Sequence, residues 1–284
     1  MKCDLHVHTV HSGMCTVPLL NRICRESYND PREVYETLKQ RGMDLVTVTD
    51  HDSIDAVEPL RRHADFFLSE EVSCRTSSGM RLHMGVYGIK ERDHIELQRR
   101  AEDMPSLLAY LEERDLLFSV NHVFSSLTGR RCDADFDEFA ARFPAVETLN
   151  GAMLELANRR AAVLASQTGK IAIGGSDAHT MASLGWTYTK VPGARNASEY
   201  LAGLKQGRTR VAGESGAYWK LTRAVASIGC LLMRERRSAL VLLPLLAAVP
   251  FITLVNLGLE YAFAHKWSRR VLWNSAVPRS DFAV

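Results

Sequence analysis

The strongest constraint on this chain is where its histidines and acidic residues fall relative to its apolar segments. Six of the ten histidines lie in short polar patches, and nearly every patch ends an apolar, β-branched run. The patches are Asp4-Leu5-His6-Val7-His8, Thr49-Asp50-His51-Asp52, Glu71-Val72-Ser73, His83, Asn121-His122 and Gly174-Gly175-Ser176-Asp177-Ala178-His179. Imidazole and carboxylate groups bind Zn²⁺, Mn²⁺ and Fe²⁺, and barrels collect such groups at the C-terminal ends of successive strands. The pattern therefore predicts one metal site assembled from distant segments.

Strand and helix signals alternate from residue 3 to about residue 212. The expected strands are 3–8, 45–49, 66–72, 82–89, 116–120, 145–149, 171–173, 187–191 and 209–211, and the expected helices are 31–41, 94–114, 135–142 and 155–167. The first helix has Asp30 as its N-cap and Pro31 at its first position, both favourable starts. Such alternation predicts a mostly parallel α/β fold with enough strands for a barrel.

The composition changes near residue 216. Residues 217–284 hold nine Lys and Arg against three Asp and Glu, a net charge of +6, which leaves −4 on residues 1–216. Within this tail, residues 238–259 form a 22-residue stretch without a charged side chain, long enough for a membrane helix. We therefore expect a catalytic domain at 1–216 and a membrane-anchoring segment at 217–284. Pro244, Pro250 and the basic residues on both sides leave a re-entrant hairpin or a buried core helix open.

The remaining composition indicates the compartment and the partners. The six cysteines are scattered without a Cys-x-x-Cys pair, which argues against a disulfide framework or a cysteine-rich zinc site. Lys2 and Asp4 at the start do not fit a signal peptide. We expect a cytoplasmic catalytic domain attached to the cytoplasmic membrane. Residues 1–216 lack a basic patch with interleaved aromatic residues, so no stable nucleic-acid partner is indicated.

The spacing within the patches supports chelation. His6 and His8 are two residues apart, so on a strand both side chains face the same way, and Asp177 and His179 share this spacing. Two such pairs on separate strands can hold a metal from opposite walls of one pocket. One His-x-His pair alone is weak evidence, but the ordered set of patches is specific.

The ordered motifs carry a family resemblance. Asp-Leu-His-Val-His-Thr, Val-Thr-Asp-His-Asp, the Glu before Val-Ser and Gly-Ser-Asp-Ala-His make residues 1–216 resemble the PHP (polymerase and histidinol phosphatase) superfamily of metal-dependent phosphoesterases. The resemblance implies a distorted (β/α)₇ barrel with two or three divalent ions in its mouth, the ions being Zn²⁺, Mn²⁺ or Fe²⁺.

The resemblance also implies a set of metal ligands. They are His6, His8, His51, Glu71, His83, His122, Asp177 and His179. Two metals would share Glu71, and a third would use His51 and His179. The family usually adds an acidic or histidine ligand shortly after the His-x-His pair. Here Ser12 is followed by Gly13, and His11 or Cys15 would have to substitute.

The expected chemistry is hydrolysis of a phosphoester by a metal-bridging hydroxide. Two ions ~3.5–4 Å apart hold the nucleophile and the phosphoryl oxygens in line, and a coordinated water has a pKa of roughly 7. We predict His179, His51 and Asp177 as the catalytic residues, with His179, His51 or His11 protonating the leaving oxygen. The substrate class is a phosphorylated small molecule or a nucleotide.

Phosphate recognition requires positive groups near the metals. Arg130 and Arg131 follow His122 in a polar loop, where a barrel places its substrate contacts, and His11 is the third candidate. A solvated loop is the simpler explanation of the two arginines.

Two alternative functions remain at this point. An amidohydrolase-like enzyme also uses an early His-x-His and a late Asp, but its bridging carboxylated lysine has no candidate, since Lys90 and Lys170 do not end a strand beside the cluster. A catalytically silent metal-binding sensor or scaffold at the membrane is suggested by Gly13. The Glu71 bridge and the intact ligand set favour the phosphoesterase.

Overall fold

A computed structural model describes residues 1–17 and 19–273, the last five of these by their backbone alone. Its strands are β1 (Lys2–Cys3), β2 (Ser69–Arg75), β3 (Arg81–Tyr87), β4 (Leu117–Val120), β5 (Ala145–Asn150), β6 (Ile171–Gly175), β7 (Thr187–Lys190) and β8 (Arg210–Gly213). Its α-helices are α1 (Pro31–Gln40), α2 (Val57–Leu60), α3 (Glu91–Arg100), α4 (Met104–Glu113), α5 (Asp133–Arg142), α6 (Glu155–Thr168), α7 (Ala197–Lys205), α8 (Tyr218–Glu235) and α9 (Leu243–Trp273). The 3₁₀ turns are η1 (Val10–Ser12), η2 (Leu20–Arg22), η3 (Met181–Ser183) and η4 (Arg237–Leu242).

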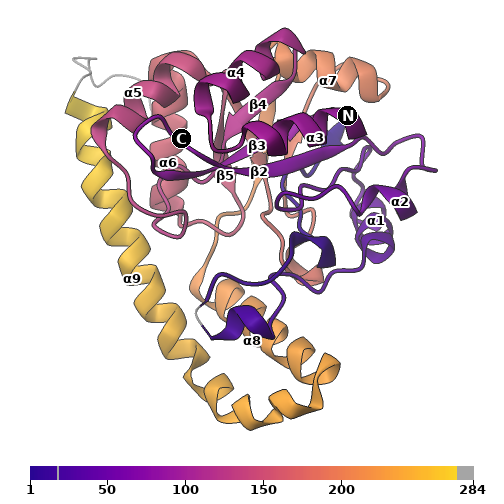
Figure 1. Cartoon of the computed structure of the whole chain (residues 1–284), viewed down its shortest axis with the longest axis vertical. Coiled ribbons are helices and arrows are strands. Elements are labelled where there is room, and N and C mark those ends of the chain that lie inside the picture. The colour runs from indigo at the N-terminus through magenta and orange to yellow at the C-terminus, as the bar shows by residue number, and fades with distance from the viewer. Residues whose placement is uncertain (18, 274–284) are drawn as a thin grey trace.

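In the described part of the chain, the regular strands form two sheets of a mixed α/β fold (Figure 1). The larger sheet has the order β2-β3-β4-β5-β6, and the smaller has the order β1-β7-β8. Strands β4, β5 and β6 are parallel, as expected, but β2 and β3 are antiparallel. The expectation of a mostly parallel sheet is wrong here, because the short turn at residues 76–80 can only join antiparallel neighbours.

Two expected strands are irregular. Residues 4–8 and 45–51 lie between β6 and β2 and make isolated bridges, such as that of Val7 with Ala178, instead of continuous ladders. Side chains take the place of the ladder, as where the Asp50 carboxylate accepts hydrogen bonds from Thr9 and Ser12. The described strands therefore do not form a closed barrel.

The main core lies between the larger sheet and helices α3 to α6. It buries Met84 and Val86 of β3 against Leu107 of α4 and Phe139 of α5. The helix expected at 94–114 is divided into α3 and α4, because Asp103 caps a new helix that has Pro105 in its first turn. These helices keep the sheet rigid where its strand ends carry the metal-binding residues.

The C-terminal segment forms a helical hairpin. Helix α8 leaves the body, η4 turns the chain, and α9 returns to pack on α6 (Figure 1). Trp267 of α9 belongs to the main core, with its ring centroid 5.4 Å from that of Phe136. Among the described residues, the helix Arg237–Ser268 is long and apolar enough to cross a membrane, a property that core helices of soluble proteins share. The boundary between 1–216 and 217–284 stays a prediction, and residues 274–284 lie outside the described part.

Candidate metal centre

The predicted ligands meet around the carboxylate of Glu71 on β2. Its Oε2 lies 3.2 Å from His6 Nε2, 3.2 Å from His51 Nδ1 and 3.6 Å from His83 Nδ1. Its Oε1 lies 3.2 Å from His122 Nε2. The Glu71 side chain is fully buried, so a single carboxylate faces imidazoles from four separate segments.

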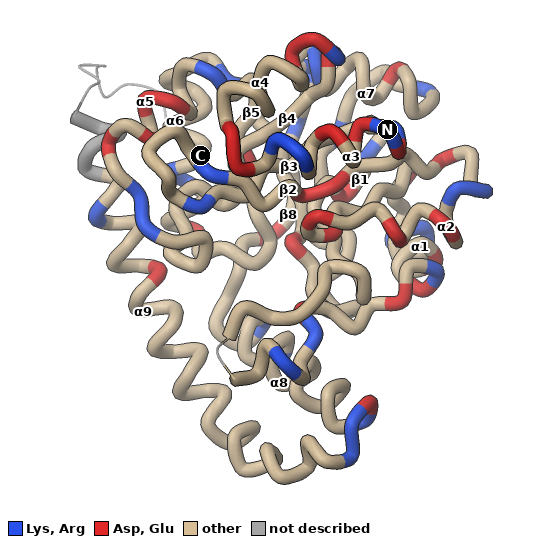
Figure 2. Tube along the Cα trace, viewed as in Figure 1, with Lys and Arg blue, Asp and Glu red and all other residues tan. Residues whose placement is uncertain are grey.

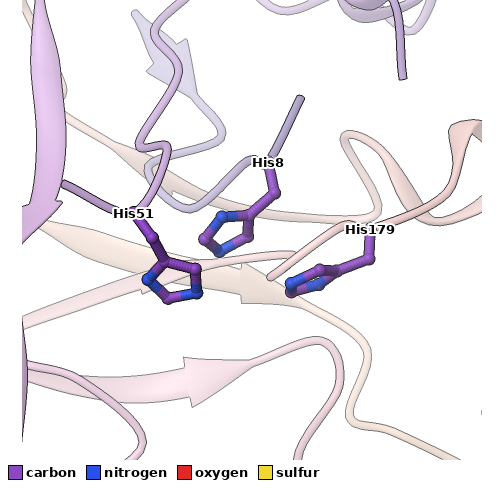
Figure 3. Close-up of side chains that lie close together, drawn as sticks. All are labelled: His8, His51 and His179. Atoms are coloured by element: carbon purple, nitrogen blue, oxygen red, sulfur yellow. The ribbon is translucent and has the colours of Figure 1, made fainter. Parts of the chain in front are cut away.

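Asp177 is the second carboxylate of the cluster. Its Oδ1 lies 3.5 Å from His6 Nε2, 3.4 Å from His8 Nε2 and 3.5 Å from His179 Nδ1. The rings of His8, His51 and His179 approach one another from three segments (Figure 3), and the His8 and His179 ring centroids are 4.2 Å apart. All eight predicted ligands therefore lie in one cluster.

The donor atoms fit divalent metal ions. Within the described residues, buried His6 Nε2, His8 Nε2, His51 Nδ1, His83 Nδ1 and Glu71 Oε2 have no hydrogen-bond partner. Buried polar atoms are rarely left unpaired, because an unpaired atom costs about 1–3 kcal/mol. Unpaired imidazole nitrogens that converge on carboxylate oxygens are the donor set of Zn²⁺, Mn²⁺ or Fe²⁺.

The protonation states of four predicted ligands suit metal binding, whereas burial is outweighed by the facing carboxylates that raise the pKa values of His6, His122 and His179, so a metal would have to displace their protons. Burial raises the pKa values of the Glu71 and Asp177 carboxyls, but the facing histidines outweigh it and hold both pKa values well below the usual range. Burial lowers the pKa of His8 and the pKa of His83 to about 3, so both rings are neutral. Ionised carboxylates and neutral imidazoles are the forms that bind metal.

Comparison with known proteins gives a family match for part of the chain. A family model described as PHP-associated matches residues 155–209, which include the Gly-Ser-Asp-Ala-His motif of the metal centre. The match supports the resemblance of this part of the chain to the PHP superfamily. An uncharacterized protein of Methanocaldococcus jannaschii is 37% identical over 54 residues, which make up 19% of this chain and 30% of that relative. The chain therefore matches less than a third of the relative's length.

Solved structures include one with a similar fold and others with weaker similarity. The crystal structure of PsfC from Pseudomonas syringae has a TM-score of 0.57 and 19% identity, and the match covers 82% of this chain and 98% of that chain. The lesion-specific endonuclease PfuEndoQ from Pyrococcus furiosus has a TM-score of 0.49 and 16% identity, with 74% of this chain and 57% of that chain covered.

Glu26 is an acidic residue near the position where the family resemblance implied a further ligand. The backbone N–H of Glu26 donates to the carbonyl of Gly13 at 3.1 Å, and the Glu26 side chain lies beside the candidate metal centre. Its carboxylate oxygens lie 3.6 Å from His51 Nε2 and 3.7 Å from His179 Nε2. The two expected substitutes lie elsewhere, since His11 faces Asp55 at 3.9 Å and Cys15 pairs through its backbone with Cys24. Sequence reasoning missed Glu26 because it lies in a loop without a periodic pattern.

Outer hydrogen bonds fix the two rings of the His-x-His pair. Ser12 Oγ donates to the Asp50 carboxylate at 2.6 Å and so accepts from His8 Nδ1 at 2.9 Å, which leaves His8 Nε2 free for metal. Glu147 does the same for His6, with its Oε1 2.7 Å from His6 Nδ1. The network assigns the ring protons to Nδ1 in both residues.

Backbone strain also marks the site. Asp177 and His122 have positive φ angles of 51° and 30°, a region that residues other than glycine rarely enter. Such strain persists only where the surrounding structure imposes it, and it is concentrated at functional sites. The side chains are thus held in their places by the fold.

The structure gives less support to the predicted substrate-binding residues than to the predicted metal ligands. Arg131 is buried, and its guanidinium donates to the carbonyl of Arg81 on β3 at 2.7 Å and to Thr128 Oγ1 in its own loop at 2.7 Å. Arg130 is exposed. Phosphate binding by Arg130, Arg131 or His11 stays a prediction.

Proposed function

We propose that the protein is a metal-dependent phosphoesterase with a dinuclear or trinuclear centre. The observation that carries the proposal is the buried Glu71 carboxylate among five imidazoles, several of whose nitrogens lack partners among the described residues. The PHP-associated match over residues 155–209 and the resemblance in fold to a structure of 19% identity support this reading. Within the proposal, residues 4–8 and 45–51 complete a distorted (β/α)₇ arrangement between β6 and β2.

The residues divide into three groups of metal ligands. One metal would be held by His6, His8, Glu71 and Asp177, a second by Glu71, His83 and His122, and a third by His51 and His179 with Glu26 beside them. Bound divalent ions supply Lewis acidity for the phosphoryl oxygens and lower the pKa of water to about 7.

The rest of the reaction depends on residues of the chain. A bond forms between the phosphorus and the water oxygen, and the bond from the phosphorus to the alcohol breaks. Glu71 and Asp177 each contact His6, and they would fix the spacing of the metal ligands around the bound phosphate. We assign the proton for the leaving alcohol to His179, which lines the cavity beside Asp177, in the form of the centre whose third metal position is empty.

The two alternative functions have weaker support. An amidohydrolase-like centre would need a carboxylated lysine to bridge its two metals, and this role is here assigned to Glu71. A silent sensor was suggested by the missing acidic group at Gly13, and Glu26 supplies a carboxylate at that position.

The test uses the full-length protein. We expect elemental analysis to find two to three metal ions per chain, and we expect turnover of bis-p-nitrophenyl phosphate or p-nitrophenyl phosphate with Mn²⁺ or Zn²⁺, since such centres hydrolyse both classes of ester. Asp177→Asn should lower metal content and abolish turnover, while Asp137→Asn on the exposed face of α5 should change neither. Bound metal without turnover of either compound would favour the sensor, and a protein without metal would refute the proposal.

A further inference from the structure

The candidate metal centre lies at one end of a cavity that is larger than the hydrolysis of a phosphate group requires. The cavity has a volume of about 590 Å³. One end is lined by Glu26, Asp177 and His179, and the other end lies between α8 and α9. Small-molecule sites have volumes of roughly 300–1,000 Å³, so the space is large enough for a substrate much longer than a phosphate group.

The walls away from the metal centre are mainly aliphatic. Helix α8 contributes Leu221, Ile228 and Leu232, and α9 contributes Leu246 and Val249. A sugar or nucleoside placed there would lose its hydrogen bonds to water and find few partners, which is costly. An alkyl chain would instead gain about 0.8 kcal/mol for each buried methylene.

One cation in the same cavity makes no ion pair among the described residues. Lys220, in the first turn of α8, lines the cavity, and its Nζ is shielded from solvent with no hydrogen-bond partner among the residues described. Burial lowers the pKa of Lys220, and the charges of Glu214 and Asp4 oppose this only in part. Arg25, which also lines the cavity, is already paired with Glu235 at 3.0 Å. Lys220 is therefore available for an anionic ligand.

We propose that the substrate is a lipid phosphate ester. Its phosphate lies at the metal centre in the cavity that Lys220 also lines, and its aliphatic chain occupies the chamber between α8 and α9. The inference rests on the proposed phosphoesterase function and names the substrate class of that same site.

The hairpin tip gives such a lipid a route from a bilayer. Exposed aliphatic side chains cover the turn, among them Leu240, Leu243 and Val241, which is 78% exposed. Arg234, Arg236 and Arg237 lie beside them, and Figure 2 shows this charged cluster next to the uncharged start of α9. An apolar surface flanked by basic residues lies in the interfacial layer of anionic membranes. Leu245 and Leu246 at the start of α9 line the cavity, so the chamber begins at this tip.

The first test is a chain-length series with the metal-loaded, full-length protein. The substrates are methyl, butyl and octyl p-nitrophenyl phosphate, which share one reacting group and differ only in the chain. We expect kcat/KM to rise with length by up to about fourfold per methylene, the factor that corresponds to about 0.8 kcal/mol. Hydrolysis of the methyl ester without any gain for the octyl ester would overturn the lipid assignment and leave the phosphoesterase function intact.

Matched variants on α8 test where the alkyl chain of the substrate binds. Ala224 lines the chamber and Ser227 is exposed on the same helix. Ala224→Trp should bring the octyl-to-methyl ratio of kcat/KM close to one, and Ser227→Trp should keep the wild-type ratio. Far-UV circular dichroism checks folding, and Ile228→Phe replaces Ala224→Trp if the latter does not fold. An unchanged ratio in a folded chamber variant would place the chain elsewhere and overturn the proposal.

Binding provides a test that does not depend on turnover. Calorimetry should find that octyl phosphate binds the full-length protein more tightly than inorganic phosphate, with a negative heat-capacity change from apolar burial. Ala224→Trp should remove this difference, and Lys220→Met should weaken the binding of both compounds. If no ester is hydrolysed but octyl phosphate still binds in this manner, the phosphoesterase function fails and the lipid-binding chamber stands. Equal binding of the two compounds would refute the chamber.

Discussion

Glu26 is the carboxylate on which the proposed third metal position depends. We predict that Glu26→Gln lowers metal content by about one ion per chain, because an amide is a poorer ligand than a carboxylate for these ions. Elemental analysis after dialysis measures the change. Glu36→Gln, an exposed change on α1, is the matched control and should keep the wild-type content. The assignment of Glu26 would be withdrawn if both variants kept the same number of ions.

Glu147 is a positioning residue that acts through two ligands. Its Oε1 accepts from His6 Nδ1, and its Oε2 accepts from the backbone N–H of His122 at 2.9 Å. Glu147→Gln replaces one acceptor by a donor, so one of these bonds is lost. Changes to such outer partners weaken metal affinity by roughly 10–100-fold, and we expect this loss in a chelator competition. Glu155→Gln at the exposed start of α6 serves as the control, and equal affinity in both variants would contradict the positioning role.

The sequence predicted some residues of the candidate site and did not predict others. His6, His8, Asp177 and His179 could be recognised because their spacing and their apolar neighbours are visible in one stretch of chain. Glu26 could not be recognised, since its position depends on a backbone contact with Gly13 across a loop. Spatial contacts of this kind exist only after the chain has folded.

Among the secondary-structure elements, the strand prediction failed where side-chain hydrogen bonds replace the ladder. Residues 4–8 and 45–51 have the composition of strands, and they do lie side by side, as the bond from Thr49 N to the Val7 carbonyl shows. Asp4 and Asp50 nevertheless accept hydrogen bonds from distant groups, among them Ser176 N and Thr9 N, and this breaks the regular ladder. A period-two pattern predicts which faces are buried but not whether a ladder will be continuous.

Strand β6 approaches the His-x-His segment closely at Gly175. A Cβ atom on Gly175 would lie 2.3 Å from His6 N and 2.5 Å from His6 Cβ, and both are fixed by the backbone. We predict that Gly175→Ala costs about 1–3 kcal/mol of stability and lowers metal affinity, because His6 must move. Urea unfolding and metal titration measure the two effects. Gly258→Ala in α9 meets no atom within 4 Å and should be neutral or stabilising. Similar values for the two variants would show that the contact is easily relieved.

For the whole molecule, both ends of the hairpin are attached to the body. At the start, Gly216 N donates to the Met153 carbonyl at 2.7 Å. At the far end, Glu260 accepts from Ser126 N at 3.0 Å, and Trp267 packs in the main core. A helix held in this way cannot cross a bilayer without losing these contacts. We therefore expect a hairpin that inserts only its tip, which differs from the re-entrant hairpin and the buried core helix that the sequence left open for residues 238–259.

Tip insertion predicts binding to anionic vesicles that depends on Val241. Burying one valine side chain contributes about 1.5–3 kcal/mol, so Val241→Asp should weaken sedimentation of the full-length protein with vesicles by roughly tenfold or more. Ile95→Asp, an exposed apolar residue on α3 of the body, should bind as the wild type does. The two variants differ only in where the charge is placed, so equal loss in both would indicate non-specific adsorption. Wild-type binding in both would contradict insertion of the tip, and a protein that pellets irreversibly in each case would instead support a membrane-spanning α9.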